Sequence, residues 1–255
     1  MARELERTSS RSRGDQRRHG IGAAIRWLGR HEFGLLLTLV VLSLGTWGTV
    51  ELVGEVLEGS TRALDRRILL LLREADDVTD PIGPRWVEEM MRDVTALGGT
   101  VVLTMLSLIV AGYLGLRRAS RTVLFMVFAI GGGNGLVYLL KHLFERPRPD
   151  LVPHGTEVYT ASFPSAHSMM SAVTYLTLAV LLAAVDSRCR VKAYVLLVAL
   201  FLTLIVGVSR VYMGVHWPTD VVAGWAIGAL WAAMCWWIVR VLQLRGTLER
   251  DAGFL

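Results

Sequence analysis

The segment AYVLLVALFLTLIVGV, residues 193–208, has no charged residue and is followed directly by Ser209 and Arg210. A near-continuous apolar run of this kind is typical of a membrane-spanning helix, because about 20 apolar residues cross the hydrocarbon of a bilayer. Five further runs occur, at residues 34–53, 99–116, 122–140, 168–185 and 221–239. The sequence therefore predicts an all-α polytopic membrane protein, a bundle of six transmembrane helices.

The composition agrees with a membrane protein. Of the 255 residues, 53% are hydrophobic, and the mean hydropathy is +0.47, which argues against a water-soluble core with a polar shell. The first apolar run is too long for a secretory signal and follows a charged leader of about 30 residues, so we expect it to be retained. Cys189 and Cys235 do not indicate a disulfide framework. The glycines at 131–133, inside the third run, indicate close helix packing.

Three regions follow from this organisation. Residues 1–31 form an Arg- and Ser-rich leader that we expect to be disordered, residues 32–243 form one helical domain, and residues 244–255 form a tail. Between the first two spans, within the connection 51–97, residues 64–73 are apolar for too short a distance to span and are charged at both ends. This pattern predicts a short interfacial helical segment, which either covers the bundle or helps to admit a lipid.

The distribution of charge predicts the orientation. Residues 1–31 hold eight Arg against three acidic residues, whereas the connection 51–97 holds six Arg against eleven. Because short cytoplasmic segments carry the excess of Lys and Arg, both termini are predicted to be cytoplasmic. The same side receives the other short basic segments, 117–121, 186–192 and the tail from Arg240. Topology explains the pI near 9.6, so no nucleic-acid partner is expected.

Three polar clusters then lie together on the outer face, at the ends of apolar runs. Lys141 and Arg148 follow the third run, and Ser165, Ala166 and His167 open the fourth. Lys and Arg bind phosphate oxygens, and a helix start offers free N–H groups and a positive dipole end to an anion. Simpler explanations are that the cations snorkel to the interface and that Ser165 is only an N-cap.

The third cluster extends from Ser209 to Asp220 and contains Arg210 and His216. Asp220 lies four residues beyond His216, and a carboxylate bonded to one imidazole nitrogen leaves the other nitrogen free for attack. Asp220 could instead be a first-turn acid that complements the helix dipole. Together, however, the three clusters supply what is needed to bind a phosphate and to attack it.

The pattern Lys-x6-Arg-Pro, Pro-Ser-x-His and Ser-Arg-x5-His-x3-Asp resembles the type 2 phosphatidic acid phosphatase (PAP2) family over about residues 60–235. The resemblance implies that His216 is the nucleophile, that Asp220 orients it, and that His167 protonates the leaving oxygen. The phosphate would be held by Lys141, Arg148, Ser165, Arg210 and the backbone of Ala166. The family often has Gly at position 166. We expect a helical conformation there, in which the Cβ of Ala causes no backbone strain.

These observations, together with the resemblance, predict a metal-independent lipid phosphatase without a cofactor that acts on a lipid phosphate substrate in the bilayer, and the resemblance implies that it acts through a phosphohistidine. Asp and Glu residues do not gather into an oxygen cage for a catalytic magnesium. Undecaprenyl diphosphate is the leading substrate, and phosphatidic acid and phosphatidylglycerol phosphate are alternatives. A lipid phosphotransferase with the same site and a lipid transporter or flippase are the competing functions.

Overall fold

The computed structural model describes residues 36–152, 160–185 and 188–244. The predicted leader 1–31 and all but the first residue of the predicted tail 244–255 lie outside the described residues. The chain divides into two units, residues 1–44 and 45–255, and the arrangement reported below is that of the second unit.

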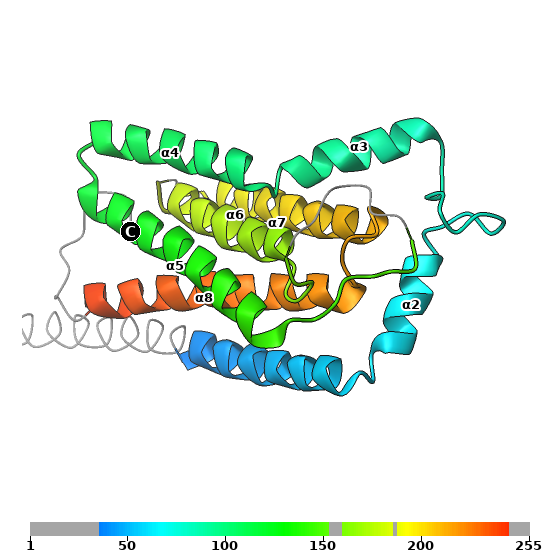
Figure 1. Ribbon diagram of the computed structural model, residues 1–255. Helices are drawn as coiled ribbons and strands as arrows, with labels where there is room; N and C mark the ends of the chain where they lie inside the picture. The colour runs from blue at the N-terminus through cyan, green and yellow to red at the C-terminus, as the bar shows by residue number, and fades with distance from the viewer. Residues whose placement is uncertain (1–35, 153–159, 186–187, 245–255) are drawn as a thin grey trace, which may run out of the picture. The chain divides into compact units, whose positions relative to one another are not determined.

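The described residues are helical apart from short connections and the outer segments (Figure 1). A first helix extends from Leu36 to Glu58. The helices that follow are α2 (Arg62–Leu70), α3 (Arg85–Ala96), α4 (Thr100–Leu116), α5 (Ser120–Phe144), α6 (Ala166–Val185), α7 (Cys189–Tyr212) and α8 (Pro218–Leu244).

Among the described residues, five helices are long and apolar enough to cross a membrane: the first helix, α5, α6, α7 and α8. The remaining predicted run, at residues 99–116, corresponds to α4, which meets this test only together with α3, from which it is bent by 47°. The prediction of an all-α polytopic membrane protein is confirmed. The bend adds a feature that the apolar pattern did not predict.

Two helices continue further than the apolar runs suggested. α5 includes Lys141 and α7 includes Arg210, so both cations lie in helix ends and not in loops. A polar residue at the end of an apolar run does not itself stop a helix. α5 stops where Glu145 adopts a left-handed conformation (φ 34°), and α7 is followed by a tight turn in which Gly214 has φ 71°.

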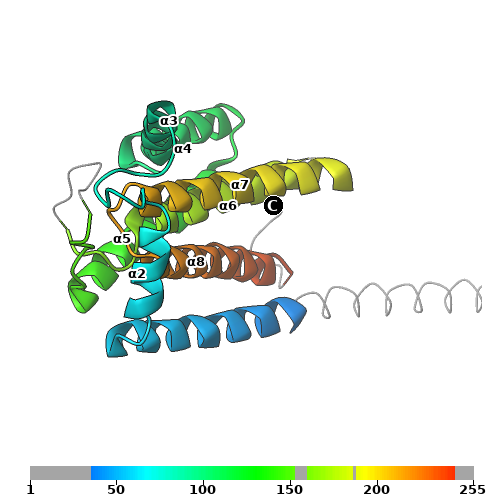
Figure 2. The ribbon, with the colours of Figure 1, turned by 90° about the vertical axis from the view of Figure 1, so that its right-hand side faces the viewer.

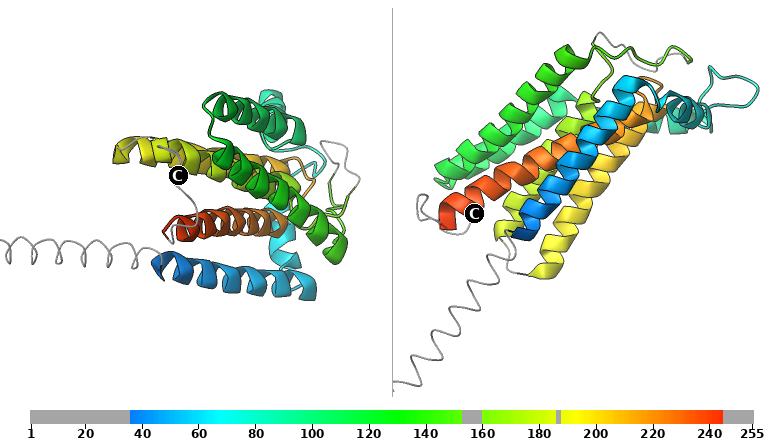
Figure 3. Two further views of the ribbon diagram at one scale, coloured as in Figure 1. Left: turned by 90° about the vertical axis from the view of Figure 1, so that its left-hand side faces the viewer. Right: turned by 90° about the horizontal axis from the view of Figure 1, so that it is seen from below.

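α6 is the central helix of the second unit and packs against α5, α7 and α8 (Figure 3). Glycines let the backbones of α6 and α8 approach closely: a Cβ at Gly228 would lie 2.5 Å from the carbonyl oxygen of Met169, and one at Gly224 would lie 2.9 Å from that of Ser165. On α5, the glycines at 132 and 133 likewise face side chains of α8 and α6 without room for a Cβ. The packing role predicted for the glycine run is confirmed at these two positions.

At one end of this unit, α2 lies across the helix ends (Figure 2). Its buried Leu69 packs with Val152, Val211 and Val221. Just after α2, Arg73 donates to the carbonyl oxygen of Tyr212 at the end of α7 (2.9 Å). The predicted short helical segment is therefore present as α2, and it is attached to the end of the bundle where the polar clusters meet.

Candidate active site

The three polar clusters come together at one end of the second unit. Backbone contacts join them: the amide of Ser165, before α6, donates to the carbonyl oxygen of Asp220 in α8 (3.0 Å). Arg148 reaches the turn before α8 and donates to the carbonyl oxygen of Val215 (2.7 Å). Lys141, Arg148 and Arg210 are close enough to His167 to interact with it electrostatically. The sequence-predicted site residues thus form one cluster.

His216 lies in the turn between α7 and α8, with only 1% of its surface exposed. Burial lowers the pKa of this imidazole to about 4, and nearby Asp220 opposes that effect only in part. Its Nε2 lies 3.3 Å from Nη1 of Arg148. Because a guanidinium can only donate, Nε2 is the acceptor and the proton of the neutral ring belongs on Nδ1. Nε2 is therefore the nitrogen with an available electron pair.

Asp220 lies behind His216 on the Nδ1 side. One carboxylate oxygen, Oδ2, is 3.6 Å from Nδ1, which is an ion-pair distance but too long for a hydrogen bond. The same oxygen accepts from the hydroxyl of Ser162 and from the backbone amide of Trp217 (2.9 Å). The carboxylate is thus held in the position from which it can stabilise a positive charge on the ring.

Arg148 is fixed by carbonyl and hydroxyl contacts on the segment between α5 and α6 and on the turn. Besides the contact with Val215, its Nε donates to the carbonyl oxygen of Thr160 (2.8 Å). Partial burial lowers the pKa of the guanidinium, which nevertheless stays charged at neutral pH. A pre-oriented fork of this kind suits two oxygens of one phosphate.

Lys141 and Arg210 approach from the ends of α5 and α7. The ammonium group of Lys141 donates to the carbonyl oxygen of Ala161. Arg210 is 4% exposed, and its Nη1 donates to the hydroxyl of Thr95 (3.1 Å), whereas its buried Nε has no partner among the described residues. A buried donor without an acceptor is costly, and a bound phosphate oxygen would satisfy it.

The start of α6 supplies the remaining donors. The hydroxyl of Ser165 accepts from the amide (3.4 Å) and the hydroxyl (2.9 Å) of Ser168, so Ser165 is the N-cap of α6. Ala166 is the first residue of the helix and has no positive φ, so a side chain is accommodated there as expected. The other two amides of the first turn, those of Ala166 and His167, have no acceptor within the helix, and they are available to an anion.

His167, one residue further, lines a cavity of about 290 Å³ between α4, α5 and α6. The other lining residues include the apolar Leu103 and Met170 and the polar Thr104 and Asn134. The cavity lies along the membrane-spanning segments. A mostly apolar space that contains a histidine suits a lipid whose polar end reaches the cluster.

The sequence analysis missed two charged residues of this region, Arg146 and Asp65. Arg146 contacts Asp220 directly (Nη1 to Oδ1, 2.5 Å), and Asp65 of α2 contacts Arg146 (Oδ2 to Nη2, 2.8 Å). The repeated dipeptide Arg146-Pro147-Arg148-Pro149 was a signal for the first, because either arginine could have reached the site. No local pattern identified the second.

Comparisons with known proteins identify the family of this chain. The family model described as PAP2 superfamily matches residues 122–243. Phosphatidylglycerophosphatase B of Bacillus subtilis is 36% identical over 146 residues, which cover 57% of this chain and 71% of that protein. The chain belongs to the PAP2 superfamily. It is a membrane-bound PAP2 lipid phosphatase, and these lipid phosphatases are a metal-independent phosphatase family.

Two further comparisons extend the likeness of this PAP2 protein. An undecaprenyl-diphosphatase of Sulfolobus acidocaldarius is 32% identical over 111 residues, 42% of this chain and 48% of that protein. The crystal structure of a transmembrane PAP2 type phosphatidylglycerolphosphate phosphatase from Bacillus subtilis aligns with a TM-score of 0.69 and 26% identity, over 82% of this chain and 98% of that one. The transmembrane PAP2 fold is thus shared nearly throughout that structure.

Proposed function

We propose that this PAP2 phosphatase hydrolyses a lipid phosphate or diphosphate through a covalent phosphohistidine on Nε2 of His216. The observation that carries the proposal is the pairing of Nε2 with Arg148, 3.3 Å apart, in a buried site where His216 is neutral. A phosphate held by Arg148 comes within reach of the nitrogen that has an available electron pair. Lys141, Arg210 and the first amides of α6 complete the positive surroundings that the transferring phosphoryl group requires.

The reaction then has two steps. In the first, Nε2 of His216 forms a bond to phosphorus, the bond from phosphorus to the lipid-side oxygen breaks, and His167 gives that oxygen a proton. In the second, water attacks the phosphohistidine, His167 takes the proton from that water, and phosphate leaves with Nε2 restored. Asp220 stabilises the positive ring during both steps, because its carboxylate lies 3.6 Å from Nδ1.

A lipid substrate is supported by the cavity beside His167. It has a volume of about 290 Å³ and extends along α4, α5 and α6, which belong to the apolar part of the chain. A lipid chain in this space would present its terminal phosphate to the cluster at the helix ends. The two relatives are described as acting on phosphatidylglycerophosphate and on undecaprenyl diphosphate, and the chemistry of the site suits both headgroups. We keep undecaprenyl diphosphate as the leading substrate, with phosphatidic acid as the third candidate.

A phosphate-release experiment tests this function. The purified full-length protein, in liposomes with EDTA present, is given the three lipids in parallel, and released phosphate is measured. We expect release from at least one lipid, and the loss of both release and phosphoenzyme in His216→Ala. His142→Ala is the matched control, because His142 is an exposed histidine of α5 whose hydrogen-bond partner among the described residues is the carbonyl oxygen of Tyr138 in its own helix. Full activity in His216→Ala would contradict the mechanism, and transfer of label to another lipid instead of water would identify a phosphotransferase.

A further inference from the structure

Asp65 is a fully buried carboxylate in an otherwise amphipathic surface helix. It has no exposed surface, and its two oxygens accept four hydrogen bonds. Oδ1 accepts from the amide of Thr219 (2.9 Å), and Oδ2 accepts from the hydroxyl of Thr219 (2.7 Å), from Arg146 (2.8 Å) and from the hydroxyl of Thr61 (3.3 Å). Burying a carboxylate costs free energy unless the charge is paired and hydrogen-bonded. The contacts of Asp65 meet this requirement, and they fix α2 to the start of α8.

The contact with Thr219 has a clear reason in the sequence. α8 begins at Pro218, so the residue at its N-cap is Trp217, whose side chain cannot accept a hydrogen bond from the helix. Asp65 supplies that missing acceptor from another helix. Asp220 supplies the other half of a capping box, because its Oδ2 accepts from the amide of Trp217 (2.9 Å). The two carboxylates therefore cap the same helix start: Asp65 accepts from the amide of Thr219, and Asp220 accepts from the amide of Trp217.

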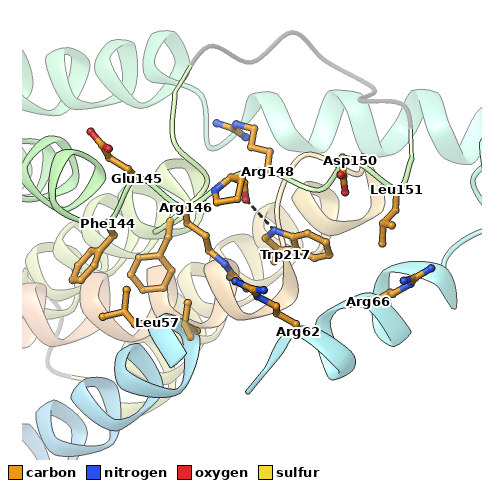
Figure 4. Close-up of a pocket in the computed structure, with 13 residues that line it drawn as sticks. Leu57, Arg62, Arg66, Phe144, Glu145, Arg146, Arg148, Asp150, Leu151 and Trp217 are labelled. Atoms are coloured by element: carbon orange, nitrogen blue, oxygen red, sulfur yellow. Dashed lines mark hydrogen bonds between the residues drawn. The ribbon is translucent and has the colours of Figure 1, made fainter. Parts of the chain in front are cut away.

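Arg146 joins these two carboxylates. Its Nη2 is 2.8 Å from Oδ2 of Asp65, and its Nη1 is 2.5 Å from Oδ1 of Asp220. Figure 4 shows the side chain passing Trp217 towards α2, and its guanidinium lies 5.8 Å from the centre of the Trp217 ring. Because both arms of the fork are occupied by carboxylates, Arg146 is not available to hold a phosphate in the way that Arg148 is.

The side chain of Arg146 is held mainly by these hydrogen bonds, because a cavity lies on one side of it. Its side chain is 12% exposed and lines a cavity of about 480 Å³ that is bounded by α2, the 145–151 segment and Trp217 (Figure 4). An open cavity on one side cannot hold a guanidinium in place by packing. Removing the Asp65 charge would leave Nη2 without its carboxylate, so that only Nη1, bonded to Asp220 and to the hydroxyl of Thr219 (2.9 Å), would hold the guanidinium, which could then turn towards that cavity.

We infer that Asp65 is a positioning residue for the proposed reaction: through Arg146 it fixes the carboxylate of Asp220 behind the nucleophile His216. Each oxygen of Asp220 then has a defined partner, Oδ1 with Arg146 and Oδ2 with Ser162 and Trp217, so that Oδ2 stays beside Nδ1 of His216. This inference rests on the proposed function of His216. It makes α2, outside the PAP2 model match at 122–243, a necessary part of the active site.

Asp65→Asn tests the inference, since the amide can still accept from Thr219 but carries no charge for Arg146. We expect kcat for phosphate release to fall by about tenfold or more with KM within about twofold, because the substrate contacts are unchanged. Asp76→Asn, the same substitution at an exposed site of the same connection, is the matched control and should leave kcat unchanged.

A double-mutant cycle separates positioning from a merely structural role. If Asp65 acts through Asp220, adding Asp65→Asn to Asp220→Asn should change the residual rate by less than about twofold. The residual rate is measured by single turnover of labelled lipid. An equal loss in both backgrounds, or a kcat in Asp65→Asn equal to that of the control, would overturn the inference. If Asp65→Asn does not fold, Arg146→Lys, which keeps the charge but lacks the fork, carries the same cycle.

The same data distinguish this inference from the function on which it rests. If the proposed function is wrong, the wild-type protein forms no phosphoenzyme and His216→Ala keeps its activity. If only the inference is wrong, the wild type forms the phosphoenzyme on His216, and Asp65→Asn behaves like Asp76→Asn.

Discussion

Arg148 donates from one nitrogen, Nη1, both to the carbonyl oxygen of Val215 (2.7 Å) and towards Nε2 of His216 (3.3 Å). The guanidinium thus covers the electron pair that the proposed reaction uses. A phosphate that binds between the two side chains takes over this donor, because charged acceptors form stronger hydrogen bonds than a neutral imidazole does. In the proposed reaction, Arg148 would therefore have two functions, to hold the phosphate and to select the tautomer of His216.

Replacing Arg148 by Lys should separate charge from geometry. The lysine keeps a positive charge but loses the fork that contacts Val215, Thr160 and His216 together. We expect kcat/KM for phosphate release to fall by about 100-fold or more, as in other losses of an oriented donor at a reacting centre. Arg66→Lys on the exposed face of α2 is the control and should keep wild-type kcat/KM. Equal rates in the two variants would contradict the two functions of Arg148.

His167→Ala should harm poor leaving groups most. A general acid matters less when the departing oxygen is already stable as an anion, so p-nitrophenyl phosphate should lose less activity than an alkyl phosphate. The measurement is the ratio of kcat/KM in wild type and variant for a series of such esters. A loss of the same size for aryl and alkyl esters would remove His167 from the role of proton donor.

The pKa of His216 gives a prediction about pH. Burial lowers it to about 4, from an ordinary value of about 6.5, so the neutral ring is favoured in the folded protein. Since the unfolded chain binds the proton first, protonation of this group favours unfolding as the pH falls from about 6.5 towards about 4, and the group has no such effect above that range. In NMR spectra of histidine-labelled protein, the ring signal that is absent in His216→Ala should show no titration between pH 5 and 8. A midpoint of about 6.5 would show that the ring is solvated.

Packing between α6 and α8 can be tested with two glycines. A Cβ at Gly228 would lie 2.5 Å from a backbone oxygen of α6, which cannot move without shifting that helix. Gly228→Ala should therefore lower the free energy of unfolding by about 1–3 kcal/mol, measured by thermal unfolding in detergent. Gly135→Ala is the control, because a Cβ there meets no atom within 4 Å. Equal unfolding temperatures in the two variants would mean that the helices are less closely packed than described.

Apolar runs in the sequence predicted the helices, and polar residues at the ends of those runs predicted the site. Residues marked by neither signal were missed. Lys141, Ser165 and His216 stood out because polar residues at the ends of apolar runs are unusual and because counting the spans places them on one side. Arg146 and Asp65 lie 81 positions apart, and their contact depends on how α2 crosses the helix ends. No periodicity reports such a contact. For the same reason the capping of α8 by Asp65 could not be foreseen, although the absence of a capping side chain at position 217 was visible.

The orientation of the protein gives the last prediction, since it decides which lipids the site can meet. The excess of Arg in residues 1–31 and in the 117–121 loop predicts cytoplasmic termini, and an odd number of crossings then places the polar clusters outside. Val78→Cys, at an exposed position between α2 and α3, should react with a membrane-impermeant maleimide in intact spheroplasts. The exposed native Cys189, at the start of α7, should react only after the cells are opened. Labelling of Cys189 alone in intact cells would place the chemistry in the cytoplasmic leaflet, where phosphatidic acid becomes the better substrate. If intact cells are labelled only when the Val78→Cys substitution is present, the result supports action on a carrier lipid diphosphate that faces the outside.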